Sequence, residues 1–300
     1  MKISGPALAL TAMITVQLGV ALSTNLFAAV TPAGSVWLRV TVAAVVLLAV
    51  TRPSLRAIPR GTLLSLLALG VLTAVMMLTF IESVARIPLG TAGAIQFAGP
   101  LMLAAVKGRR LTALIWPLLA LVGVLGLTQP WAGALNVIGI GFALASAAGW
   151  AGYIVLTQHV GNRLTGLQGL ALSLAISSVV IAPFGASAAI AGVTPLVALE
   201  AVGLAVLIPL LPFSLELVAL RRMTVPAFGT LMAVEPAVAT VIGLVVLAQS
   251  PNPLQLLGVA LVVVAGIGAQ RVRADIREAA SGNDRSRMPA TESSQLPAPS

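Results

Sequence analysis

The chain has 300 residues, of which 59% are hydrophobic and 8% are charged, and its net charge is +9. Soluble domains use roughly 25% charged residues to cover their surface, so this composition and a mean hydropathy of +1.07 exclude a water-soluble protein. The basic residues are spread over short loops and one tail, a pattern that indicates membrane topology and disfavours a nucleic-acid-binding protein.

Ten apolar stretches are long enough to cross a hydrocarbon layer of ~30 Å as helices. The first is predicted to be retained, because its apolar run after Lys2 is longer than the core of a signal peptide. In chain order the predicted spans are 6–30, 35–50, 62–81, 88–106, 112–128, 133–158, 165–190, 196–220, 225–248 and 253–270. Residues 271–300 are rich in Arg, Asp, Glu, Ser, Pro and Gly, which predicts a disordered cytoplasmic tail.

Basic residues collect in every second connection between these spans. Connections after even-numbered spans contain Arg52, Arg56, Arg60, Lys107, Arg109, Arg110, Arg163, Arg221 and Arg222. The odd-numbered connections contain no basic residue except Arg86. Because Lys and Arg accumulate on the cytoplasmic side, both termini are predicted to be cytoplasmic in a multi-pass protein of the inner membrane.

One arrangement of residues occurs twice, at offsets of 133, 134, 136 and 135 residues. The first copy is Phe80, Glu82, Pro100 and Gly123, and the second is Phe213, Glu216, Pro236 and Gly258. We therefore expect two five-span repeats, 1–131 and 132–270. Five is odd, so the second repeat must be inverted in the membrane. The predicted fold is an all-α membrane protein with ten transmembrane helices in two inverted repeats, a geometry typical of alternating-access transporters.

Polar groups at mid-membrane depth are the first candidates for function, because each ionised one costs ~3 kcal/mol or more there. Glu235 lies about half way through the ninth span, and Pro236 after it should free a backbone carbonyl near Met232. Gln96 has a similar depth one turn before Pro100, but its amide cannot carry a proton. The sequence also allows a plain hydrogen bond to a neighbouring helix for Gln96 or for a protonated Glu235.

Four further residues are candidate solute contacts. Arg39 is the only cation within the predicted membrane core. It either extends to the interface or faces the interior, where its planar fork suits a carboxylate. Gln17 and Thr24 are seven residues apart, so they share one helical face that should point inward. Tyr153 is either an interfacial anchor or part of the cytoplasmic mouth of a cavity.

Two carboxylates lie near the ends of their predicted spans. Glu82 and Arg86 are four residues apart and are predicted to form an interfacial ion pair. Glu216 has no basic residue at that spacing within its span, which leaves open either a pairing with Arg221 or Arg222 or a gating role.

Several segments resemble EamA-type transporters of the drug/metabolite transporter superfamily. The most specific are residues 228–237, FGTLMAVEPA, and residues 210–216, LLPFSLE; residues 88–90, 97–100 and 149–153 add to them. The resemblance extends over 12–270. It implies export from the cytoplasm of small metabolites, among them amino acids such as threonine or homoserine, driven by proton antiport and centred on Glu235. Related exporters commonly have Glu at the position of Gln96, so this chain has one central carboxylate in place of two.

Other functions remain open on the sequence. The chain could export another metabolite or a drug-like cation, or it could be an intramembrane enzyme or a passive receptor. The predicted spans contain no Asp or Cys, and His159 is placed in a loop, so an enzyme would depend on Ser and Glu alone. No cofactor and no metal are expected. The expected partners are a small solute, protons and the lipid bilayer but no nucleic acid, and a homodimer is left open.

Overall fold

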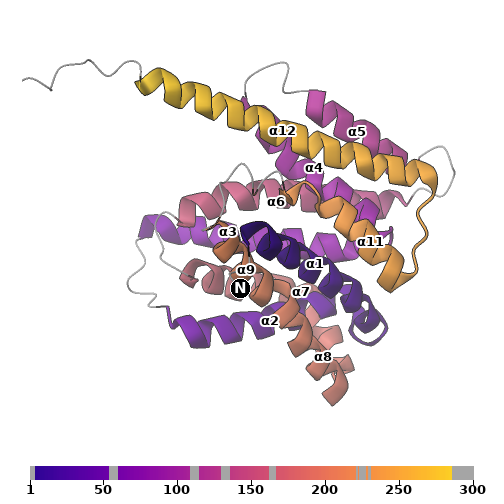
Figure 1. Cartoon of the computed structure of the whole chain (residues 1–300). Coiled ribbons are helices and arrows are strands. Elements are labelled where there is room, and N and C mark those ends of the chain that lie inside the picture. The colour runs from indigo at the N-terminus through magenta and orange to yellow at the C-terminus, as the bar shows by residue number, and fades with distance from the viewer. Residues whose placement is uncertain are drawn as a thin grey trace, which may run out of the picture.

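The computed structural model describes residues 4–53, 60–108, 115–129, 136–161, 167–220, 222, 228 and 231–285. All regular secondary structure in these ranges is helical, which confirms the predicted all-α class (Figure 1). The α-helices are α1 Gly5–Ser23, α2 Phe27–Thr51, α3 Arg60–Val84, α4 Leu89–Gly108, α5 Ile115–Thr128, α6 Val137–Gly161, α7 Gln168–Gly192, α8 Pro195–Ala205, α9 Leu211–Leu220, α11 Glu235–Leu247 and α12 Pro253–Arg285. Two short elements are the 3-10 helix η1, Thr24–Leu26, and the π-helix η5, Val206–Leu210.

Four helical stretches of the described chain are long and apolar enough to cross a membrane: Gly5–Thr51, Gly61–Val84, Val137–Thr157 and Gln168–Gly192. The first has 47 residues and contains two of the predicted spans, which are separated at Thr31, whose φ is 61°, just before Pro32. The 3-10 helix η1 lies within the first of these predicted spans. Shorter apolar helices cover Leu89–Leu103, Ile115–Thr128, Pro195–Leu210, Glu235–Leu247 and Pro253–Gly268. The chain is therefore a multi-pass membrane protein. The basic loop residues Arg56, Arg109, Arg110, Arg163 and Arg221 lie outside the described residues.

The eighth and ninth predicted spans are interrupted. In the eighth, η5 separates α8 from α9, and Ile208 has extended backbone angles of φ −147° and ψ 113° before Pro209. In the ninth, a turn at Ala233 and Val234 precedes α11, so Glu235 and Pro236 begin a new helix. Pro236 therefore does not interrupt a continuous helix, and the freed carbonyl near Met232 stays a prediction. Pro236 sits in a first turn, where a helix needs no N–H from it, whereas Pro100 lies inside the continuous α4.

The C-terminal helix is longer than the sequence predicted. α12 continues through residues 271–285, where disorder was expected (Figure 1). Ala274, Glu278, Ala279 and Ala280 favour helix, so a helix already formed by the apolar residues before them continues at little cost. The rest of the predicted tail, 286–300, lies outside the described residues.

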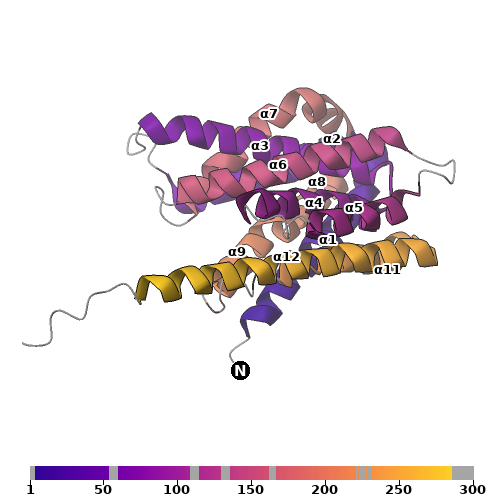
Figure 2. The ribbon, with the colours of Figure 1, turned by 90° about the horizontal axis from the view of Figure 1, so that it is seen from above.

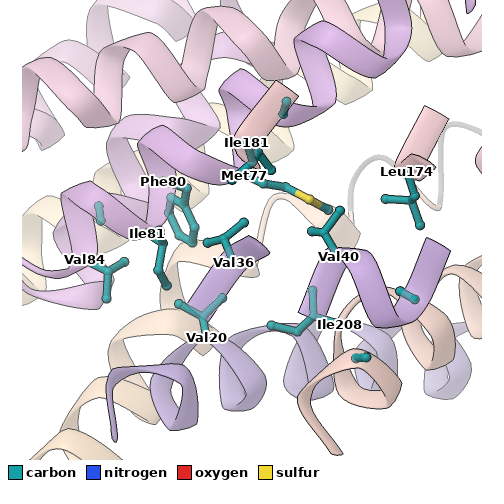
Figure 3. Packing of buried hydrophobic residues seen from close by; sticks show 14 of the residues in the cluster. Val20, Val36, Val40, Met77, Phe80, Ile81, Val84, Leu174, Ile181 and Ile208 are labelled. Carbon is teal, nitrogen blue, oxygen red and sulfur yellow. The ribbon is translucent and has the colours of Figure 1, made fainter. Parts of the chain in front are cut away.

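The helices pack in long side-by-side pairs. α2 lies along α7, α3 along α6, and α5 along α12 (Figures 1 and 2). The largest cluster of buried side chains joins α1, α2, α3 and α7 to η5, with Val20, Val36, Met77, Ile181 and Ile208 among its members (Figure 3). This apolar packing surrounds the few polar side chains inside the bundle and excludes water from them.

Two glycines, Gly123 and Gly258, allow α5 and α12 to cross at close range. They occupy equivalent positions in the two copies of the repeated arrangement. A Cβ added at Gly123 would lie 2.7 Å from the carbonyl oxygen of Gly258, and one added at Gly258 would lie 2.6 Å from that of Gly123. Real Cβ atoms do not approach backbone so closely, so the two helices need glycine at this crossing.

We expect Gly123→Ala to destabilise the protein, because the added methyl group must push α5 away from α12. Overpacking of this kind costs about 1–3 kcal/mol. The measurement is thermal unfolding of the purified protein in detergent. Gly141→Ala is the matched control, because a Cβ there has no atom within 4 Å. Equal melting temperatures for the two variants would contradict the proposed crossing.

Candidate functional site

Glu235 and Gln17 form the central polar pair of the bundle. The Oε1 atom of Glu235 accepts a hydrogen bond of 3.1 Å from Nε2 of Gln17 on α1. Glu235 is 9% exposed and Gln17 is 1% exposed. Glu235 Oε2 and Gln17 Oε1 have no hydrogen-bond partner among the described residues. Leaving a buried acceptor unpaired costs about 1–3 kcal/mol, so these two oxygens favour a proton or a donor group on a solute.

The local fold explains why this pair forms. Glu235 is the first residue of α11, where the helix dipole favours a negative charge. α1 packs against α9, α11 and η5. Two residues after Gln17, Gly19 touches η5 so closely that an added Cβ would lie 2.6 Å from Cγ1 of Ile208. η5, which interrupts the eighth predicted span, therefore contacts α1 at Gly19. The start of α11, in the ninth predicted span, contacts α1 two residues away, at Gln17.

Glu216 and Tyr153 are both half-buried. Glu216 lies in α9, which packs against α1, the helix that carries Gln17. Tyr153 packs against the buried cluster around Leu66 and Leu172. Arg221, one of the two basic partners considered for Glu216, lies outside the described residues.

Gln96 is part of a separate chain of hydrogen bonds. Its Nε2 donates to Ser146 Oγ at 2.7 Å, and Ser146 Oγ donates to the carbonyl oxygen of Met76 at 2.9 Å. These bonds link α4, α6 and α3. Gln96 therefore makes the interhelical hydrogen bond that the sequence allowed, and no hydrogen bond in the described chain joins it to Glu235.

Arg39 faces the interior of the bundle, which excludes the alternative that it extends to the interface. It is 2% exposed, and its Nη1 donates to Ser23 Oγ at 3.1 Å. Its Nε has no partner among the described residues, and no carboxylate there lies within ion-pair distance of it. A buried guanidinium with free donors is suited to a carboxylate.

The other residues on the predicted polar face of the first span do not act alike. Thr24 lies in η1, where its hydroxyl donates to the carbonyl of Ala21 at 2.7 Å. This hydrogen bond is local, within one turn of the chain. Ser23 is the residue that reaches Arg39, and it also donates to the carbonyl of Gly19 at 2.7 Å. The sequence placed Ser23 beside this inward-facing polar stripe without naming its partner, and it gave no role to Ser146, because serine is common on helix surfaces and is not ionisable.

Glu82 and Arg86 form the predicted ion pair. Arg86 Nη1 donates to the Glu82 carboxylate and to the Glu82 carbonyl oxygen, and the guanidinium carbon lies 5.0 Å from the ring centre of Phe142. Both charged side chains are partly exposed. The pair anchors the end of α3 to α6 and lies apart from the buried polar pair.

A bundle of apolar helices with an uncompensated carboxyl and guanidinium in its interior is the arrangement of a membrane transporter. Comparison with known proteins agrees. Residues 137–268 match the EamA-like transporter family. The threonine/homoserine exporter RhtA of Escherichia coli K12 is 34% identical over 268 residues, which are 87% of this chain and 89% of that protein. RhtA of Salmonella typhimurium LT2 is 33% identical over 268 residues, again 87% of this chain and 89% of that protein.

The chain therefore belongs to the EamA-like transporter family, which is a family of transporters and not of enzymes. The fold itself has been seen before. A solved crystal structure with 19% sequence identity matches 92% of this chain and 100% of its own with a TM-score of 0.57.

We expect Arg39→Met to stabilise the protein, because it removes a buried charge that has no carboxylate partner in the described chain. Replacing buried charges by apolar groups of similar volume is neutral or stabilising by about 1–4 kcal/mol. The melting temperature in detergent should rise by roughly 2 °C or more. Arg52→Met, at an exposed helix end, should leave it unchanged. A fall of several degrees for Arg39→Met alone would mean that Arg39 holds the fold together.

Proposed function

We propose that the protein is a secondary active exporter of a small amino acid of the threonine and homoserine kind, driven by proton antiport. The observation that carries this proposal is the buried carboxyl of Glu235, which keeps one oxygen without a partner among the described residues. The relatives named above are exporters of threonine and homoserine, and at 34% identity they support this class of solute.

The packing of the helices supports ten spans in two inverted repeats. If the repeats are related by a two-fold axis in the membrane plane, spans that occupy equivalent places should meet across that axis. α2 packs on α7, α4 on α11, and α5 on α12, which pairs the second, fourth and fifth predicted spans with the seventh, ninth and tenth. Two such halves can rock about a central site and expose it alternately to each side.

Competition at Glu235 would couple the two fluxes. A bound proton neutralises the carboxyl and makes it a donor, so the protonated carboxyl no longer attracts the ammonium group of an amino acid, and proton and ammonium exclude each other. A solute that binds from the cytoplasm then displaces the proton. After the solute has left on the other side, a proton binds and neutralises the carboxyl for the return step. Proton antiport follows from this exclusion.

Arg39 would hold the carboxylate of the same solute. Ser23, its hydrogen-bond partner, is six residues after Gln17 in α1, a rise of about 9 Å along the helix axis. An amino acid held at both ends by charge-assisted hydrogen bonds of about 2.8 Å suits a separation of this order. Gln17 would steady Glu235, and Gln96 would contribute only through its link to Ser146.

The basic connections support an orientation with both termini in the cytoplasm of the cell and the export step across the inner membrane. Both repeats lie in one chain, so a homodimer is not required. A second candidate is export of a drug-like cation. A second, half-buried carboxylate in the bundle, Glu216 of α9, favours it, because two carboxylates attract a cation more than one does, whereas the buried Arg39 disfavours it.

We expect Glu235→Gln to abolish pH-gradient-driven efflux of labelled threonine and homoserine from proteoliposomes, because an amide cannot exchange the proton. Exchange of labelled for unlabelled amino acid should survive in part. Glu82→Gln is the matched control, since that carboxylate is used in a partly exposed ion pair. Coupled efflux by Glu235→Gln at the wild-type rate would refute the role of Glu235.

The role of Arg39 is tested with two ligands that differ in one group. Threonine and the amine left when its carboxylate is removed should be compared by ligand-induced thermal shift of the protein and of Arg39→Met. We expect Arg39→Met to weaken the binding of threonine at least tenfold and to leave the binding of the amine unchanged. An equal loss for both ligands would show that Arg39 does not contact the carboxylate.

A further inference from the structure

Two adjoining cavities open between α4, α5, α11 and α12, near the connection 249–252. One has a volume of about 190 Å³ and the other about 320 Å³. They share Pro88, Thr91, Leu127 and Gln255 in their walls. Every polar side chain that lines them is a hydroxyl or an amide, and no charged side chain of the described chain is among them. Such walls offer hydrogen bonds without holding an ion tightly, which suits a zwitterionic or neutral solute.

The first cavity touches α11, the helix that begins at Glu235. Thr240 lines it and lies five residues after Glu235, a rise of about 7.5 Å along the helix. The Thr240 hydroxyl donates to the carbonyl of Pro236 at 2.8 Å, so it points toward the start of α11. Opposite it, Gly90 of α4 also lines the cavity, and a Cβ there would lie 2.3 Å from Thr240 Oγ1. α4 and α11 are therefore in close contact at Gly90 and Thr240, about one and a half turns along α11 from Glu235.

Hydrogen bonds between neutral groups connect the helix ends beside the cavities, near the connection 249–252. Gln249 Oε1 accepts from the backbone N–H of Leu89 at 3.0 Å, which ties the connection after α11 to the start of α4. Gln129 and Asn252 exchange two hydrogen bonds of 2.9 and 3.1 Å between the end of α5 and the start of α12. A neutral hydrogen bond contributes only about 0.5–1.5 kcal/mol net, so these contacts can hold the helices together and still part readily.

We propose that these cavities are the outlet through which the solute leaves Glu235 for the outer face, and that Gln249 and the Gln129–Asn252 pair hold this outlet shut. The assignment of the outer face follows from the connections 129–132 and 249–252, which contain no basic residue. The inference rests on the proposed function for its inner end at Glu235. The transported solute is zwitterionic or neutral, because a net charge would find no counter-charge along these walls.

The natural absence of cysteine makes the outlet directly testable. A single cysteine in Thr240→Cys should react with a water-soluble, membrane-impermeant thiol reagent added outside intact cells, and the reaction should block export. Val241→Cys is the matched control: it is the next residue of α11, it is 56% exposed on the outer surface of the bundle, and it would face lipid. We expect Thr240→Cys to react at least tenfold faster than Val241→Cys.

Two further variants complete the test: a cysteine at a second residue that lines the cavities, and a substitution of Gln249. Thr91→Cys, on the opposite wall, should react like Thr240→Cys and replaces it if that variant does not fold. Adding Gln249→Ala should speed labelling at Thr240→Cys several-fold, because the closed contact with Leu89 is lost. Equal labelling of the lining and control positions, labelling only from the cytoplasmic side of inverted vesicles, or no effect of Gln249→Ala would each overturn the proposal.

This result is independent of proton coupling. Labelling from outside combined with normal coupling in Glu235→Gln would keep the outlet and reject the role of Glu235. Loss of coupling in Glu235→Gln without labelling at Thr240→Cys would reject the outlet and keep that role.

Discussion

The buried carboxyl group of Glu235 lies among mostly apolar side chains, and only one of its oxygens has a hydrogen-bond partner in the described residues. A buried acid in an apolar bundle needs hydrogen-bond donors from the protein or from a bound species. Gln17 supplies one such donor from α1. The interruption before Glu235 places it at a helix N-terminus, and η5 breaks the neighbouring span where Gly19 of α1 approaches it. The two breaks thus meet α1 two residues apart, at Gln17 and at Gly19.

The two buried polar networks meet this requirement differently. Gln96, Ser146 and the Met76 carbonyl form a continuous chain of hydrogen bonds that joins α4, α6 and α3. The bond between Gln17 and Glu235 joins α1 and α11 and leaves two acceptor oxygens without partners in the described residues. A satisfied network stiffens the helices that it joins, whereas an unsatisfied one is available to a ligand. Of these two networks, only the one at Glu235 contains a group that can exchange a proton.

The sequence was most informative where the pattern depended on composition and spacing, and least where local geometry decided. Apolar runs predicted the helices, and the depth of Glu235 and Arg39 marked both as functional candidates. The bond from Gln17 to Glu235 joins residues 218 positions apart, which no local pattern specifies. The start of a new helix at Glu235 was not predicted, because Pro236 is compatible with either a kink within a helix or the first turn of one. The extension of α12 to Arg285 was missed because a charged composition was given more weight than helix propensity.

The central claim is that solute and proton compete for the Glu235 carboxyl, and the most direct measurement is proton release on binding. Threonine or homoserine should be added to the purified protein in weakly buffered detergent solution while the pH is recorded. The account predicts that the wild-type protein releases protons in proportion to bound solute and that Glu235→Gln binds or fails to bind without any release. Release from Glu235→Gln equal to that of the wild type would contradict it.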